Sequence, residues 1–287
     1  MDEYKNSKKS GASIGTRRVL GYVALVIATI LCLFWFYLLV INSTRSNAEL
    51  GRGFTVIPST HLGKNFVNVV HGQLPIFNGL LNSFIIAICS AALSTYFSTM
   101  TAFAIHAYDF KLKKFMFMFI LAIMMIPTQV TALGFIDLMR RLKLMDTFIP
   151  LIVPAIAAPA VFFYMKQFME TSLPKELLES ARIDGASEFI IFNRIALPLM
   201  KPAISVQAIF AFVTSWNNYF TPALVLKTEN RKTLPILIAE LRAADFLKFD
   251  MGQVYMFITL SILPVVVIYL ILSKNIVGGM TVGSVKG

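Results

Sequence analysis

The stretch GLLNSFIIAICSAALSTYFSTMTAFAIHAY, residues 79–108, decides the fold class of this chain. It contains no Asp, Glu, Lys or Arg, and it exceeds the roughly 20 apolar residues that a helix needs to cross a bilayer. Five other windows also lack those four residue types: 19–44, 115–136, 147–165, 202–226 and 251–273. The sequence therefore predicts an all-α membrane protein with six transmembrane helices, at about 19–41, 79–108, 115–136, 147–165, 202–226 and 251–273.

The overall composition agrees with a membrane protein. Of the 287 residues, 57% are hydrophobic and only 14% are charged, whereas about a quarter of the residues in a soluble domain are charged. This excludes a disordered chain, an ordinary cytosolic enzyme and a nucleic-acid-binding module. The first apolar core, 19–41, is longer than the 7–15 residues or so of a signal peptide, so we expect it to be a retained span, with cleavage as the alternative.

Charge outside the apolar windows predicts the orientation. The tail 1–18 carries five basic residues, Lys5, Lys8, Lys9, Arg17 and Arg18, in a chain of net charge +11. Basic residues favour the cytoplasmic side of a membrane. We therefore expect a cytoplasmic tail at 1–18 and, after six spans, a cytoplasmic C-terminus. The segment 166–201 then lies inside the cell, and 227–250 lies outside.

Polar side chains inside the predicted spans have two interpretations. Ser83, Ser90, Ser94 and Thr101 share one helix face, which suits either close helix packing or the wall of a sugar-sized passage. The candidates for the pathway itself are Gln129, Trp216, Asn217 and Asn218. Amides beside an aromatic ring suit a hydroxyl-rich substrate, but they could equally hold neighbouring helices together.

Several functions are disfavoured by what the chain lacks. No predicted span contains a charged residue, although ion-coupled carriers commonly keep one along the path, so a self-sufficient carrier is the less favoured alternative. There is no Walker A motif, and His61 and His71 have no ligand cluster around them. We expect no metal site, no cofactor and no enzymatic activity, and we expect the energy for transport to come from another protein.

The connection between the fourth and fifth predicted spans contains a distinctive motif. Residues 173–189 read LPKELLESARIDGASEF. Leu177, Leu178 and Ala181 make an apolar stripe that we expect to fill a cleft on a partner. Gly185 is placed to end the helix in the left-handed conformation, and Ser187 is placed to cap the next helix. A helix lying on lipid is the alternative, but its acidic side chains favour a protein partner in the cytoplasm.

The same segment resembles the "EAA" loop of ABC importer membrane subunits. The match runs from Glu179 through Asp184-Gly185-Ala186 and on to Phe192, Ile195, Leu197-Pro198 and Pro202, with Ser180 in place of the middle alanine. The C-terminal sequence 278–287 resembles the carbohydrate branch of these permeases, of the type of the maltose system's G subunit.

The resemblance implies a function and a set of partners. The chain would be a single permease domain over 19–287 in an ATP-driven sugar importer of a bacterial cell membrane. It would catalyse no reaction itself. A second permease subunit, two cytoplasmic ATPase subunits and an extracellular sugar-binding protein would complete it, and oligosaccharides are the expected sugar class. The residues expected to couple to the ATPase are Glu179, Ala181, Arg182, Asp184, Gly185 and Ala186. Those expected to contact the binding protein are Glu240 and Arg242.

Overall fold

The structure is a computed structural model that describes residues 2–72, 74–243 and 250–283, with side chains described for 18–72, 74–241 and 250–274. Throughout these residues the regular structure is helical, which confirms the predicted fold class. Two compact units are present, one formed by 1–71 with 245–260 and the other by 72–244 with 261–287. This division by contacts does not test the single permease domain expected over 19–287, which stays a prediction.

The first unit is held together by contacts around a glycine. It contains α1 (Asp2–Ser43), α2 (Asn47–Gly51), α3 (Leu62–Val70) and the beginning of α15 (Met251–Gly283). The Asn65 amide donates to the carbonyls of Ser43 (2.8 Å) and Arg45 (2.9 Å). A Cβ at Gly252 would lie 2.5 Å from the Arg45 carbonyl and 2.8 Å from the Asn65 amide nitrogen. Glycine is thus required where α15 crosses this corner.

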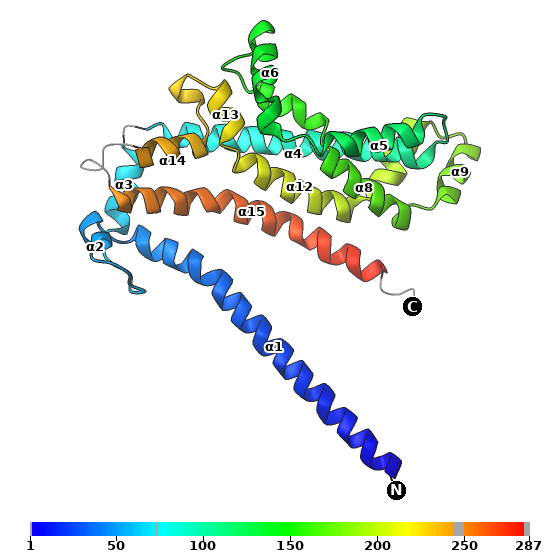
Figure 1. Cartoon of the computed structure of the whole chain (residues 1–287), viewed down its shortest axis with the longest axis horizontal. Helices are drawn as coiled ribbons and strands as arrows, with labels where there is room; N and C mark the ends of the chain where they lie inside the picture. The colour runs from blue at the N-terminus through cyan, green and yellow to red at the C-terminus, as the bar shows by residue number, and fades with distance from the viewer. Residues whose placement is uncertain (1, 73, 244–249, 284–287) are drawn as a thin grey trace. The chain divides into compact units, whose positions relative to one another are not determined.

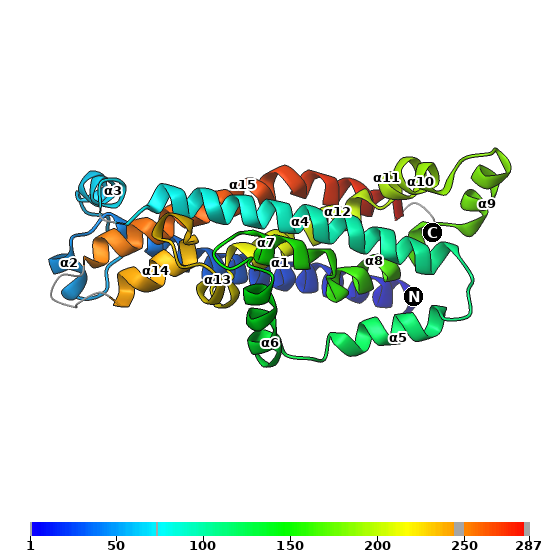
Figure 2. The same ribbon diagram turned by 90° about the horizontal axis from the view of Figure 1, so that it is seen from above.

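The second unit is built around α4 (Ile76–Ala107). This helix packs against α8 (Pro159–Ser172) and α12 (Lys201–Trp216), and also against α7 (Ile149–Ile152), the 3₁₀ turn η1 (Val153–Ile156) and α14 (Leu234–Ala243). Figures 1 and 2 show α4 as one unbroken helix beside them. Small residues such as Ala87, Ala91 and Ala102 are buried along it, so neighbouring helices can approach closely.

The predicted third span is not one helix. The window 115–136 forms α5 (Lys113–Ile123) and α6 (Thr128–Arg141), which are bent by 97° relative to each other. Figure 2 shows α6 turning away from α5. Pro127 causes the break, because the residue before a proline is disfavoured in the helical conformation and proline has no N–H to donate.

The fourth predicted span runs on past its expected end, and the fifth is preceded by a bend. α8 continues beyond residue 165, and Lys166 forms an ion pair with Glu170 in that extension. The chain then runs through α9 (Lys175–Ile183), α10 (Glu188–Ile191), the π-helical turn η2 (Phe192–Ala196) and α11 (Leu197–Leu199). The helix over Glu188–Leu199 meets α12 at an angle of 79°.

The window 202–226 is interrupted as well. After α12 come α13 (Phe220–Val225), the 3₁₀ turn η3 (Glu229–Arg231) and α14. Within the described residues, four helices are long and apolar enough to cross a membrane, and the number reaches six if each bent pair is one span. The six-span arrangement therefore stays a prediction.

Candidate functional site

The segment 174–189, called the coupling segment below, has the predicted helix–glycine–helix shape. Gly185 has φ +80°, in the left-handed region, which confirms its predicted conformation. The Ala186 N–H donates to the Ala181 carbonyl (3.0 Å), and the Gly185 N–H donates to the Arg182 carbonyl (3.0 Å). These two bonds make a Schellman motif, which satisfies the last carbonyls of α9.

The cap expected at the start of α10 is absent. Ser187 occupies the N-cap position, but its side chain makes no capping hydrogen bond. The prediction that its hydroxyl caps the helix was therefore wrong. Its backbone carbonyl instead accepts from the Ile191 N–H at 2.9 Å, so the first turn of α10 is held by the backbone alone.

The apolar side chains of the coupling segment divide into a buried set and an exposed set. Leu178 and Ala181 are buried in this chain's own core, together with Phe103, Leu173 and Ile191. Leu177 is partly exposed, and Ile183 and Phe189 are 87% and 70% exposed. The predicted stripe of Leu177, Leu178 and Ala181 was therefore wrong as a partner-facing surface, because two of its members anchor α9 to its own chain.

Arg182 connects three separate segments. Its Nε donates to Glu188 Oε1 at 2.7 Å, and one of its Nη atoms lies 3.5 Å from the Ala107 carbonyl. Its guanidinium lies 5.3 Å from the centroid of the Tyr108 ring, within the range of a cation–π interaction. The hydrogen bond from Arg182 lowers the pKa of the Glu188 carboxyl. Arg182, which the resemblance places among the ATPase-coupling residues, is thus paired within its own chain.

Other residues of the coupling segment remain at the surface. Glu179 and Asp184 are exposed, and Ala186 is half-buried. Just before the segment, His106 Nε2 lies 2.9 Å from the Leu173 carbonyl, which ties the end of α4 to the chain that enters α9. Sequence reasoning missed Glu188 and Tyr108, because their spacing from Arg182 has no helical periodicity.

The other end of α4 holds the segment that follows α13. The Asn82 amide donates to the carbonyls of Asn230 (2.8 Å) and Lys232 (3.0 Å). Ser83 Oγ accepts from the Leu234 N–H at 2.8 Å. A Cβ at Gly79 would overlap the Leu237 side chain, so α14 approaches the first turn of α4 closely.

The small polar face of α4 mostly serves packing. Ser90 donates to the Leu151 carbonyl (3.2 Å) and Ser94 to the Ala91 carbonyl (3.1 Å), and both are buried. Thr101 instead lines a cavity of about 690 Å³ with Ser98, Thr128 and Thr131. Packing is therefore observed for the first part of the face, and a cavity wall is observed at its end.

The pathway candidates do not converge on one site. Trp216 is buried and stacks on Phe212, with ring centroids 5.7 Å apart. It lines a cavity of about 230 Å³ with the exposed Asn217. Asn218 accepts a hydrogen bond from the Thr221 N–H (3.3 Å), and Gln129 is exposed on α6.

The loops at the α14 end contain a carboxylate with several donors. Asp146 Oδ2 accepts from the Thr228 hydroxyl (2.5 Å), and Oδ1 accepts from the N–H groups of Lys227 (2.8 Å) and Thr228 (3.0 Å). These bonds, with the nearby Arg231, lower the pKa of Asp146 to about 2. Glu240 pairs with Lys232 at 2.7 Å. The side chain of Arg242 lies outside those described, as do residues 244–249 of this loop.

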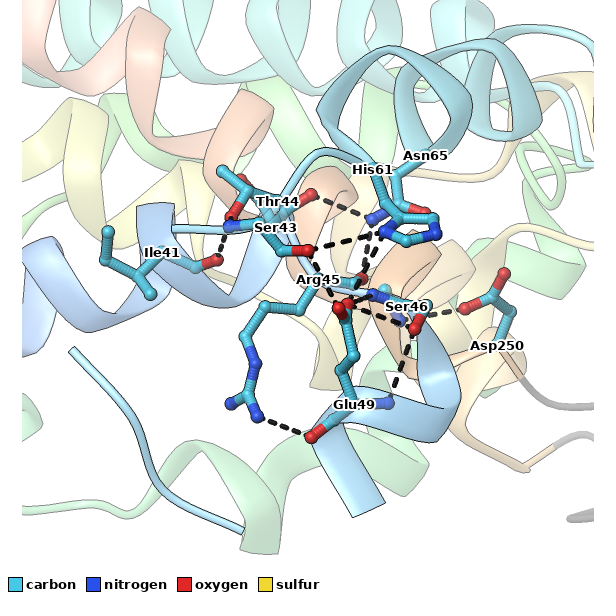
Figure 3. A network of polar contacts seen from close by, with 11 residues as sticks. Ile41, Ser43, Thr44, Arg45, Ser46, Glu49, His61, Asn65 and Asp250 are labelled. Atoms are coloured by element: carbon cyan, nitrogen blue, oxygen red, sulfur yellow. Dashed lines mark hydrogen bonds and ion pairs between the residues drawn. The ribbon is translucent and has the colours of Figure 1, made fainter. Parts of the chain in front are cut away.

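A second polar network lies in the first unit (Figure 3). Glu49 accepts from the Ser46 N–H (2.8 Å) and the Ser59 hydroxyl (2.9 Å), and these bonds lower its pKa to about 2. His61 Nδ1 lies 3.4 Å from the same carboxylate. Among the side chains described, no three His, Cys, Asp or Glu residues are grouped as metal ligands. The network is best explained as the cap of α2.

Comparison with known proteins gives one family. Residues 94–282 match the family described as "Binding-protein-dependent transport system inner membrane component". The chain is 35% identical over 265 residues to the arabinooligosaccharides transport system permease protein AraQ of Bacillus subtilis, covering 90% of this chain and 92% of that protein. It is 30% identical over 268 residues to the sn-glycerol-3-phosphate transport system permease protein UgpE of Pectobacterium atrosepticum, covering 91% and 95%.

The fold also matches that of a solved structure. It is a crystal structure of a bacterial ABC transporter involved in the import of the acidic polysaccharide alginate. The alignment covers 89% of this chain and 95% of that chain, with a TM-score of 0.75 and 21% sequence identity.

Proposed function

Because this chain belongs to the family of binding-protein-dependent transport system inner membrane components, we propose that it is the permease subunit of an ATP-driven importer of sugars, with oligosaccharides as the substrate class. The names of its AraQ relatives support the oligosaccharide class. The observation that carries the coupling role is the coupling segment itself, in which a fixed glycine turn presents Ile183 and Phe189 outward while Leu178 anchors the helix inward.

One of two cytoplasmic ATPase subunits is the partner that the coupling segment of this chain fits. Burying a large apolar side chain stabilises an interface by about 1.5–3 kcal/mol, and Leu177, Ile183 and Phe189 are available for this. Glu179 and Asp184 lie exposed beside them for charged contacts at the rim. Gly185, Ala186 and the Arg182–Glu188 pair set the direction of α9 relative to α10. ATP hydrolysis takes place on the ATPase subunits.

A second permease subunit covers α6. Val130 and Leu133 on this helix are 72% and 85% exposed, and Thr128, Gln129 and Thr131 are exposed beside them. Polar side chains at membrane depth are costly unless they face protein or water. A protein neighbour satisfies both kinds of side chain, whereas lipid satisfies only the apolar ones. This supports a heterodimer in which the other permease subunit forms the rest of the pathway.

The orientation follows from these partners. The N-terminus, the C-terminus and the coupling segment lie on the cytoplasmic side of a bacterial cell membrane. The segment 227–250 lies outside, where Glu240 and Arg242 meet the sugar-binding protein. Trp216 and Asn217, which share a cavity, and the adjacent Asn218 are the pathway residues nearest to that outer segment in sequence.

Reconstitution tests the proposed function directly. The complete complex, with both permease subunits, both ATPase subunits and the binding protein, is placed in liposomes and supplied with radiolabelled arabino-oligosaccharides. Accumulation that requires ATP and the binding protein supports the importer. Uptake by this chain alone under an ion gradient would instead identify a secondary carrier and refute the proposal.

A further inference from the structure

The coupling segment is attached to α4 by contacts that do not follow the chain. Arg182 reaches the carbonyl of Ala107, the last residue of α4, and its guanidinium covers the Tyr108 ring. His106 binds the Leu173 carbonyl at 2.9 Å. Leu178 packs into the same core as Phe103. A displacement of α9 therefore pulls on the end of α4 through a cation–π contact, hydrogen bonds and apolar packing together.

The outer end of the same helix is attached to the proposed external segment. The Asn82 amide donates to the carbonyls of Asn230 and Lys232 before α14, and the Ser83 hydroxyl accepts from the Leu234 N–H. Leu234 and Leu237 are fully buried, and Leu237 lies against Gly79. The beginning of α14 is thus fixed to the first two turns of α4.

Between these two attachments α4 is uninterrupted. It contains no proline, and its one glycine, Gly79, lies in the first turn. From Ser83 to Ala107 the helix rises by roughly 36 Å at about 1.5 Å per residue. The covalent route from the coupling segment to α12 instead passes through the π-helical turn η2 and a bend of 79°. Such interruptions absorb displacement, so α4 is the stiffer connection.

We propose that α4 is a rigid link that passes the movement of the coupling segment to the segment 229–237, and that this link carries the mutual dependence of ATP hydrolysis and binding-protein contact. The inference rests on the proposed function, since it assigns an ATPase to one end and a binding protein to the other. Arg182 and Glu188 act as positioning residues at the inner end. Asn82 and Ser83 do so at the outer end.

A double-variant experiment tests this link in the complete reconstituted complex. The measured quantity is the factor by which the binding protein with sugar stimulates ATP hydrolysis. Arg182→Gln removes the ion pair with Glu188, and Asn82→Ala removes the two hydrogen bonds from the Asn82 amide while leaving that of Ser83. Each variant is expected to lower the stimulation about five-fold. This is the factor that corresponds to the net free energy of a typical hydrogen bond. Because the two attachments act in series on one helix, the double variant is expected to match the worse single variant.

Independent sites behave differently. Effects of residues more than about 10 Å apart normally combine without interaction, so a double variant with the product of the two single losses overturns the proposal. Lys274→Gln is the matched control. It removes an exposed charge on α15, a helix that carries neither attachment, and it is expected to leave the effect of Arg182→Gln unchanged.

Two further measurements separate a link from local damage. The charge-reversed pair Arg182→Glu with Glu188→Arg is expected to restore part of the stimulation that either single reversal removes. A cysteine at the exposed Glu229 is expected to change its labelling rate when a non-hydrolysable ATP analogue binds, and to lose that change in Arg182→Gln. An unaltered response in Arg182→Gln contradicts the link. Failure of the wild-type complex to transport sugar would contradict the proposed function instead.

Discussion

Replacing Gly185 tests whether the backbone turn after α9 sets the coupling angle. Its φ of +80° lies in the left-handed region, and a Cβ at this position would have no atom within 4 Å. A side chain therefore meets no steric obstacle, and the whole penalty comes from the backbone. That penalty is about 1–2 kcal/mol for a residue with a Cβ. It lowers the population of the left-handed turn, relative to other conformations at residue 185, by a factor of about 5–30.

A graded series separates this strain from side-chain effects. Asn tolerates the left-handed conformation better than most residues, so Gly185→Asn is expected to retain most transport. Gly185→Ala is expected to lose part of it, and the β-branched Gly185→Val most of it. Gly63→Ala is the control, because that position on α3 also has nothing within 4 Å and has no positive φ.

The assay measures sugar accumulated per ATP hydrolysed by the reconstituted complex, alongside the amount of chain inserted in the membrane. Insertion is expected to stay constant across the series, while the ratio of transport to hydrolysis falls in the order Gly, Asn, Ala, Val. Normal transport by Gly185→Val, or an Asn variant as impaired as the Val variant, would refute the reasoning.

The remaining predictions concern other parts of the chain. Gly252→Ala is expected to destabilise the purified protein by about 1–3 kcal/mol through overpacking, seen as a lower Tm. Gly63→Ala is expected to leave the Tm unchanged, because a Cβ there would have nothing within 4 Å. Equal Tm values for the two variants would contradict this. The pKa of Asp146 is lowered from 3.8 to about 2, so its ionised form stabilises the fold fully above pH 3.8, and this stabilisation is lost as the pH falls from there through 2. The Tm difference between wild type and Asp146→Asn should therefore be the same at pH 8 and pH 5. A cysteine at Asn217 is expected to react with an aqueous thiol reagent during turnover much faster than one at Trp216, and equal rates would contradict the burial of Trp216.

The helical elements could be predicted from the sequence because charge is expensive in a bilayer and is therefore confined to connections. This identified α4 within a few residues. It could not identify the break between α5 and α6, because a proline within an apolar stretch is compatible with either a kinked span or two separate helices. Pro127 was visible in the sequence, but the angle it produces depends on the neighbouring helices.

The coupling segment was predictable where local chemistry decides the conformation. Gly185 follows a short amphipathic helix, and a left-handed glycine is the common way to end one. The direction of α9 about its axis was not predictable, since Leu177 and Leu178 are adjacent and equally apolar. Tertiary packing against Phe103 and Ile191 buries Leu178 and leaves Leu177 outward. The pairing of Arg182 with Glu188 likewise depends on the turn between them.

Site-specific photo-cross-linking from the coupling segment tests the central claim most directly. A benzophenone side chain is introduced at Ile183, Phe189 or Leu178 in turn, and the assembled complex is irradiated. Adducts with the ATPase subunit are expected from Ile183 and Phe189, which are exposed, and none is expected from Leu178, which is buried in the chain's own core. An assembled, ATP-hydrolysing complex that gives no ATPase adduct from Ile183 or Phe189 would contradict the claim that this segment docks on the ATPase.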